Sequence, residues 1–360
     1  MRNLSRPFLV VAAASVAFSA MASAQTTPSA LFGPGDAVPG RPGLTFGQFG
    51  FNDTTFNRPY LSPDGQFYAL EAFVGTDSGL NEGLLAGPVG GGSLVLRDGD
   101  AASFNAGQTI DSIDGDLKVN SNRIVAVALD TTGDNENFIT TYDLMTDINA
   151  VVVREGDAVG PVAGEFYGVT LNYPTISETG TVGFYSNLST GVLPGSQDTF
   201  YQVGGGLIAQ SGVTQPTGQI AGELHALENV NFGDVYLNGD GSRYILQGDL
   251  EGASDSDDVT IVDGRVVAQE GQPLPADAMG RLVGDLNSSR SEPFMAASGD
   301  WIAYGEFSDG DDWVVSNDTL LAATVREEPG PSRLLYAHTA LLDRLGIRGG
   351  RYARPMLSAE

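Results

Sequence analysis

Acids, amides and one arginine recur at one position of this chain, just before a turn that returns about every 58 residues. Paired carboxylates there could cleave a glycosidic bond as acid and base or nucleophile, and a mixed set could bind sugars or cations. Aligned repeats place seven residues at this position, namely Asn57, Arg58, Asp114, Asp116, Asn172, Asp234 and Glu292. Asp116, Asp234 and Glu292 are the candidates for catalysis, and the other four are candidates for ligand binding. The alternative interpretation is that all seven only cap strand ends.

A second group of acids lies in two loops of the last repeats. Its members are Asp255, Asp257, Asp258, Asp309, Asp311 and Asp312. Carboxylate oxygens are the preferred ligands of calcium, so these loops predict a weak calcium site, with an ordinary solvated turn as the alternative. His225 and His338 are the only histidines and cysteine is absent, which excludes three-histidine zinc sites and thiol catalysis.

Two sequence motifs, which we call the first and second markers, recur with the same period and define the elements that carry these residues. The first is a turn before an apolar run, as in LSPDGQFYAL from Leu61, and its copies align on Gly65, Asn122, Gly180, Gly241 and Gly299. The second ends a later run, as in LVLRDGDA from Leu94 and VVVREGDA from Val151. Between the markers, each period holds four short strand-like runs separated by Gly, Asn, Asp and Pro. The chain is therefore predicted to be an array of five four-stranded units.

A single four-stranded unit cannot bury both of its apolar faces, and packing against copies of itself around an axis solves that problem. The sequence therefore predicts an all-β protein, a β-propeller of five four-stranded blades over residues 25–325. Six blades and a linear solenoid are the alternatives. The segment ALFGPGDAVPG, from Ala30 to Gly40, is an isolated copy of the second marker. We expect it to pair with the last blade, so that the N-terminal strand closes the ring.

The two ends of the chain differ from the repeats. Arg2, Arg6, an apolar run and Ala22-Ser23-Ala24 have the order of a signal peptide, predicted to be residues 1–24. We therefore expect a secreted or periplasmic protein without membrane insertion after cleavage. Residues 326–360 form a basic tail, for which a short helix and disorder are both open.

The balance of charge restricts the partners. The chain has 45 acidic and 18 basic residues, a net charge of −27, and Lys118 is its only lysine. Such an excess repels phosphate backbones and anionic lipids, which argues against nucleic-acid and membrane-surface binding and favours cations. A solubilising acidic surface is the simpler interpretation of the same numbers.

The turn formed by Ser62, Pro63, Asp64 and Gly65 resembles the SPDG turn of WD40-like and TolB-like propeller repeats. The pairing of REGDA at Arg154 with NYPTISETGTVGF from Asn172 resembles a family of secreted bacterial tandem-repeat proteins. The resemblance implies a propeller over residues 30–325 and assigns no activity. The chain differs from that family at the C-terminus, where we find no apolar helix followed by basic residues of the kind that anchors such proteins.

We therefore predict a monomeric, noncatalytic binding or scaffold protein, stabilised by calcium if by any cofactor, whose partner is an extracellular protein or a glycan. The alternative is a carbohydrate hydrolase with its carboxylates at the mouth of the axial channel.

Overall fold

The computed structural model describes residues 32–47, 56–76, 79–133, 136–189, 193, 197–218, 226–229, 235–253, 256–286 and 292–323. Contacts divide the chain into a short unit, Met1–Phe32, and a second unit, Gly33–Glu360, to which every strand belongs. The predicted signal peptide and the basic tail lie outside the described residues. No described segment forms an α-helix, and none is a helix long and apolar enough to cross a membrane.

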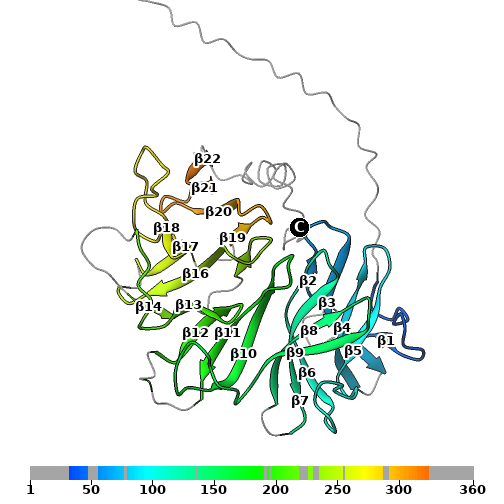
Figure 1. Ribbon diagram of the computed structural model, residues 1–360. Coiled ribbons are helices and arrows are strands. Elements are labelled where there is room, and N and C mark those ends of the chain that lie inside the picture. The colour runs from blue at the N-terminus through cyan, green and yellow to red at the C-terminus, as the bar shows by residue number, and fades with distance from the viewer. Residues whose placement is uncertain are drawn as a thin grey trace, which may run out of the picture. The chain divides into compact units, whose positions relative to one another are not determined.

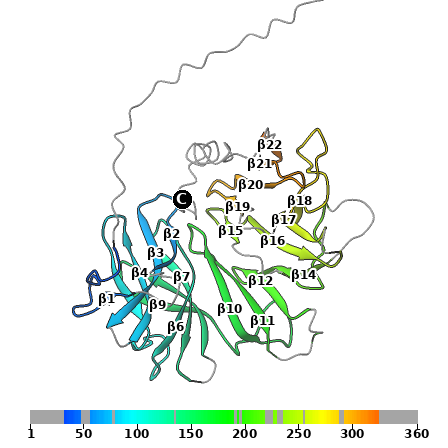
Figure 2. The ribbon, with the colours of Figure 1, turned by 180° about the vertical axis from the view of Figure 1, so that it is seen from behind.

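The strands form five antiparallel sheets, one for each predicted repeat, in chain order from blue to orange in Figures 1 and 2. The first sheet contains β1 (Thr45–Phe46), β2 (Phe56–Leu61), β3 (Phe67–Thr76), β4 (Gly79–Pro88) and β5 (Ser93–Arg97). The second contains β6 (Ile110–Val119), β7 (Ile124–Thr131), β8 (Asn137–Asp143) and β9 (Ile148–Arg154). The third contains β10 (Tyr167–Ile176), β11 (Val182–Leu188), β12 (Thr199–Val203) and β13 (Gly206–Gln210).

The last two sheets repeat the pattern. The fourth contains β14 (Leu227–Asn229), β15 (Tyr236–Leu237), β16 (Tyr244–Leu250), β17 (Asp258–Val262) and β18 (Arg265–Gln269). The fifth contains β19 (Glu292–Met295), β20 (Trp301–Glu306), β21 (Asp312–Ser316) and β22 (Thr319–Ala323). In the first sheet β1 and β2 both pair with β3, and in the fourth β14 and β15 both pair with β16, so each pair fills the place of one strand. All other successive strands of a sheet are antiparallel neighbours, which confirms the prediction of an all-β fold made of four-stranded units.

The turn between the first two strands of each repeat is fixed by its residue types. Its first residue is Ser or Asn in four repeats, and the side-chain oxygen accepts a backbone N–H that follows, as Asn120 does from Ile124 at 3.0 Å. The fourth turn residue has a positive φ, which is 67° at Gly65. In the second repeat Arg123 takes this conformation, at 69°, and donates its N–H to the Asn120 carbonyl. The alignment anchor at Asn122 is therefore wrong by one residue.

The apolar core forms between consecutive sheets. One buried cluster joins the first two sheets, with Leu84 and Val127 among its members, and another joins the last two, with Val267 and Trp313. Two further clusters join the second to the third sheet and the third to the fourth. The three middle sheets thus bury both faces against their neighbours in the chain, and the first and fifth bury one face in this way, which is the packing of a propeller-like fold.

The N-terminal segment is described from Phe32 onward. β1 pairs with β3 of the first sheet, with Thr45 opposite Gly75, and the backbone of Ala37 bridges to Thr45. The same short bridge follows the second marker in the next repeats, as between Ala101 and Thr109. Ala30 and Leu31, which correspond to the strand of that marker, lie outside the described residues. The fifth sheet contains no strand from the N-terminus among the described residues, so closure of the ring by the N-terminal strand stays a prediction.

Candidate functional site

A pocket lies where the turn ends of all five sheets come together. Its volume is about 570 Å³, within the range of small-molecule sites. Every repeat contributes the end of its inner strand and residues of the following turn. We call it the central pocket; its walls include Tyr60, Leu61, Lys118, Val119, Thr175, Ile176, Tyr236, Leu237, Phe294 and Met295.

Five of these side chains occupy one equivalent position, two residues before the first residue of the turn. They are Tyr60, Lys118, Thr175, Tyr236 and Phe294. The Lys118 ammonium nitrogen lies 3.7 Å from the centre of the Tyr60 ring and 5.2 Å from that of Tyr236. Residues of the first, second and fourth sheets therefore meet within one cation–π group. The geometry shows that the equivalent positions converge.

The central pocket is mainly apolar and aromatic. The rings of Tyr236 and Phe294 stack with centres 4.5 Å apart and planes inclined by 38°. Lys118 is 9% exposed and Tyr60 is 5% exposed. The Tyr60 hydroxyl is buried and has no hydrogen-bond partner among the residues that the structure describes. The site thus combines aromatic faces with one ammonium group and one phenol.

The rim of the central pocket is held together by hydrogen bonds between successive turns. The Ser121 hydroxyl accepts a hydrogen bond from the Asp64 N–H at 3.3 Å. The Ser121 N–H donates to the Glu178 carboxylate at 3.0 Å. Thr179 N–H donates to the Gly239 carbonyl, and Gly239 N–H donates to the Ala297 carbonyl, each at 2.9 to 3.0 Å. These contacts connect all five turns in chain order, so the carboxylates at the rim take part in structural hydrogen bonds.

The polar residues predicted before the turns are described only in part. Asn172 is half-buried on β10, next to a register shift between Asn172 and Thr175. A similar shift on β6, between Ile113 and Leu117, spans the segment with Asp114 and Asp116. Asp234 lies outside the described residues, and of Asn57, Arg58, Asp114, Asp116 and Glu292 only the backbone is described. Their predicted roles stay predictions.

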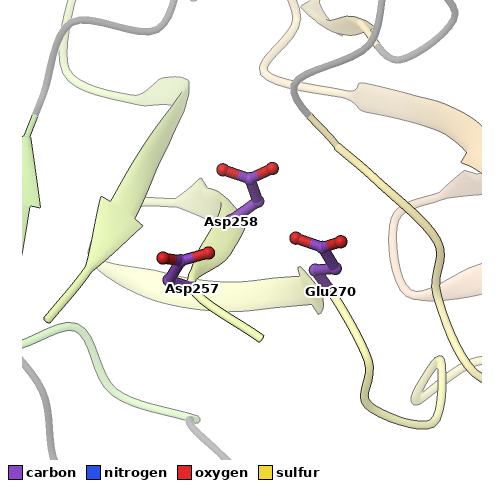
Figure 3. A group of neighbouring side chains, drawn as sticks. All are labelled: Asp257, Asp258 and Glu270. Atoms are coloured by element: carbon purple, nitrogen blue, oxygen red, sulfur yellow. The ribbon is translucent and has the colours of Figure 1, made fainter. Parts of the chain in front are cut away.

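A carboxylate cluster lies at the opposite, loop end of the fourth sheet (Figure 3). Asp257 and Asp258 stand at the start of β17 and Glu270 follows β18, with carboxylate oxygens within 4.8 Å of one another. Burial, together with the charges of Asp258, Asp285 and Asp257, raises the pKa of Glu270 to about 7. Two of the predicted metal ligands are therefore brought together with a third acid that the prediction omitted.

The other predicted metal ligands have different surroundings. Asp255 lies outside the described residues. Asp311 is 3.5 Å from Arg281, whose guanidinium also contacts Asp277 at 2.9 Å and lies over the Phe307 ring. The hydrogen bond from Arg281 lowers the pKa of Asp277. Asp309 accepts the N–H of Asp311, and Asp312 begins β21. The structure does not bring these acids together with Asp257 and Asp258 into the carboxylate cluster.

The first two repeats have related groups of acids at their loop ends. Burial is the main cause that raises the pKa of Glu82, Asp98 and Asp130, and neighbouring carboxylates add to it. Asp98 and Glu270 occupy the same place in the second marker, after Arg97 and Gln269. The antiparallel pairing of the last two strands of a sheet places this acid beside Glu82 in the first repeat and beside Asp258 in the fourth. Comparing the acid of the second marker with the acids at the start of the preceding strand would therefore have identified Glu270 in the sequence.

The fold and the central pocket define an all-β, propeller-like protein whose five sheets together form one pocket. The chain belongs to the family of unknown function DUF7453, whose family model matches residues 25–291. No curated protein matches the sequence.

Among solved structures, TolB from Acinetobacter baumannii is 12% identical with a TM-score of 0.39, covering 73% of this chain and 52% of TolB. The Dos1 propeller is 11% identical with a TM-score of 0.34, covering 78% and 59%. Prolyl oligopeptidase B from Galerina marginata is 12% identical with a TM-score of 0.38, covering 78% and 37%. This chain thus spans about half the length of TolB and a smaller part of the peptidase.

Proposed function

We propose that this protein is a secreted or periplasmic, noncatalytic binding protein that holds its ligand in the central pocket of a five-bladed propeller. The observation that carries the proposal is the convergence of one equivalent side chain from each of five sheets on a single pocket. Ligand pockets are concave, mostly apolar and furnished with few polar groups, and this pocket has that composition.

The carboxylates of the rim favour binding over catalysis. A glycoside hydrolase needs two carboxyl groups free to exchange protons across the scissile bond. Asp64 accepts a hydrogen bond from the Ser62 hydroxyl at 2.6 Å, and Glu178 accepts two from Ser121. These acids already have structural roles. The hydrolase alternative therefore depends on Asp116, Asp234 and Glu292, and it fails if Asp234→Asn with Glu292→Gln leaves all activity on a glycan panel unchanged.

Filling the central pocket tests the binding proposal. Ala297 is an exposed turn residue at the rim, so Ala297→Trp should fold and obstruct the pocket. Ala253 is equally exposed at the loop end, and Ala253→Trp is the matched control. Ligands found by thermal shift with panels of glycans and small organic molecules should lose binding to Ala297→Trp and keep it with Ala253→Trp. If no ligand binding distinguishes the two variants, the proposal is wrong.

We further propose that calcium stabilises the fourth sheet at the carboxylate cluster. Gln269 supports this proposal because its side-chain oxygen is buried and has no partner among the described residues, beside Glu270 in the chain. Carboxylate and amide oxygens together suit calcium. Calcium chloride should raise the melting temperature near neutral pH, and Asp258→Asn with Glu270→Gln should abolish the rise. An equal rise in this double variant would contradict the proposal.

A further inference from the structure

We propose that the ligand of the central pocket is an organic acid with a single carboxylate on an apolar, ring-containing body. The carboxylate would bind the Lys118 ammonium and the Tyr60 hydroxyl, and the ring would lie against the aromatic wall. This inference rests on the proposed function, because it names the class of ligand for the same site.

The position of Lys118 carries the first step. It is the only lysine of a chain with a net charge of −27, and it stands at a position where three other repeats have an aromatic residue. Burying an ammonium group is costly unless anionic and polar partners compensate. The Tyr60 and Tyr236 rings and further contacts within the protein stabilise the buried ammonium. The ammonium has three N–H donors, so it can bind a ligand carboxylate as well as groups of the protein.

The Tyr60 hydroxyl is an independent second observation. The exposed fraction of Tyr60 is 5%, and the residue lines the central pocket. Its hydroxyl has no hydrogen-bond partner among the described residues. Buried hydroxyl groups are nearly always hydrogen-bonded. A carboxylate next to Lys118 would accept a hydrogen bond from this phenol, so the two donors would share one anionic group.

The remaining walls define the body of the ligand. Tyr236 and Phe294 form a stacked pair, and aliphatic side chains of every sheet complete the lining. Aromatic pairs favour a further ring at stacking distance. The volume of about 570 Å³ suits a small molecule rather than a folded domain. A second anionic group on the ligand would meet Asp64 and Glu178 at the rim, so one carboxylate fits better than two.

A cationic ligand is the competing class, because aromatic rings also bind cations. In this pocket the Lys118 ammonium already lies 3.7 Å from the Tyr60 ring centre. A second positive charge in the same space would be repelled by the first at short range. The part of the pocket next to Lys118 therefore favours negative charge, although the rim and the whole protein are negatively charged.

A matched pair of probes tests the inference. The acid is 3-(4-hydroxyphenyl)propionate and the neutral control is 3-(4-hydroxyphenyl)propionamide, with binding measured by calorimetry. Because a charge-assisted hydrogen bond is the stronger one, we expect the acid to bind about tenfold more tightly than the amide. Lys118→Met should remove this preference. Arg265→Met removes the same charge from an exposed pair with Asp318 and should leave it unchanged.

The Tyr60→Phe variant covers the case in which Lys118→Met does not fold. It removes only the hydroxyl and should weaken binding of the acid several-fold while the amide loses less. Equal binding of acid and amide, or failure of both probes to bind, overturns the inference. The proposed function survives either result as long as some panel ligand is lost in Ala297→Trp and kept in Ala253→Trp. It falls only if no ligand makes that distinction.

Discussion

The two ends of the sheets solve the problem of polar groups in different ways. At the turn end, Ser and Asn side chains satisfy their own turns, and hydrogen bonds join each turn to the next. At the loop end, carboxylates gather, and the pKa values of Glu82, Asp98, Asp130 and Glu270 are all raised. The turn end is therefore electrostatically relaxed, whereas the loop end retains repulsion between like charges.

The turn end is therefore expected to be rigid, and the loop end is expected to respond to pH, cations and salt. A binding pocket needs fixed walls, and hydrogen bonds between successive turns supply them, mostly between neutral groups, although the Glu178 carboxylate takes part in one link. Clustered carboxylates respond to protons, cations and salt. The fifth repeat has an exception, because Arg281 bridges Asp277 and Asp311 and offsets part of their negative charge within the protein.

Removing Arg281 should have the largest effect on this comparison. Its side chain is 16% exposed and that of Asp277 is 3% exposed, so Arg281→Met leaves nearly buried carboxylates without their counter-ion. We expect the free energy of unfolding to fall by about 3 kcal/mol. Arg265→Met, in an exposed pair, should cost less than about 1 kcal/mol. Denaturant titration measures both, and equal losses would show that the loop end does not depend on burial of charge.

Asn120→Ala should give the next largest effect, at the turn end. Asn120 is 1% exposed, accepts the Ile124 N–H and donates to the Ser177 carbonyl of the next repeat at 3.0 Å. Losing both bonds leaves the Ile124 N–H without its acceptor, while the Ser177 carbonyl keeps the hydrogen bond from the Gly180 N–H. The change should cost about 2 kcal/mol without any dependence on pH. Asn122→Ala, an exposed change in the same turn, should cost less than about 1 kcal/mol. A pH-dependent loss in Asn120→Ala would contradict the distinction between the ends.

The pH dependence of stability should come from the loop end. The pKa of Glu270 is raised from 4.5 to about 7, so the folded protein holds this proton more tightly than the unfolded chain between those values. Stability therefore rises as pH falls from about 7 toward 4.5, and the raised pKa values of Glu82, Asp98 and Asp130 act in the same direction. Glu270→Gln should raise the melting temperature by ~1–3 °C above neutral pH and change it little near the lower limit. A profile identical to that of the wild type would exclude Glu270 as a source.

The smallest expected effect concerns salt. A net charge of −27 repels an anionic probe at long range, while the contact with Lys118 is short and shielded. Raising ionic strength across the physiological range should therefore increase the association rate of the phenolic acid by about twofold and leave its dissociation rate nearly unchanged. Stopped-flow fluorescence measures both rates. An association rate that falls with salt would mean that an attractive local field dominates.

The sequence predicted the strands better than the site. Period, turn residues and strand-like runs are local features, and the antiparallel sheets follow from them. The pocket residues were missed because Tyr60, Tyr236 and Phe294 have the pattern of ordinary core positions. The one sequence signal at this position is Lys118, the only lysine of the chain, which stands where three other repeats have an aromatic residue.

One further difference has a physical cause that residue types do not show. Arg123 adopts a conformation usual for glycine, so matching residue types placed the anchor one residue early. Pairing of the segment from Ala30 to Gly40 with the last blade stays a prediction, because Ala30 and Leu31 lie outside the described residues. Which strands pair across the chain depends on which sheet edge is near, and residue types alone do not contain that information.

The convergence of one side chain per repeat gives this scaffold an unusual capacity for divergence. A substitution at any of five positions would change one wall of the central pocket, namely residues 60, 118, 175, 236 and 294. The turns that follow these positions are held by hydrogen bonds of other residues. A gene library varied only at those five codons would explore many ligand chemistries on an unchanged backbone. Duplicated genes could separate in selectivity by the same route, one point mutation at a time.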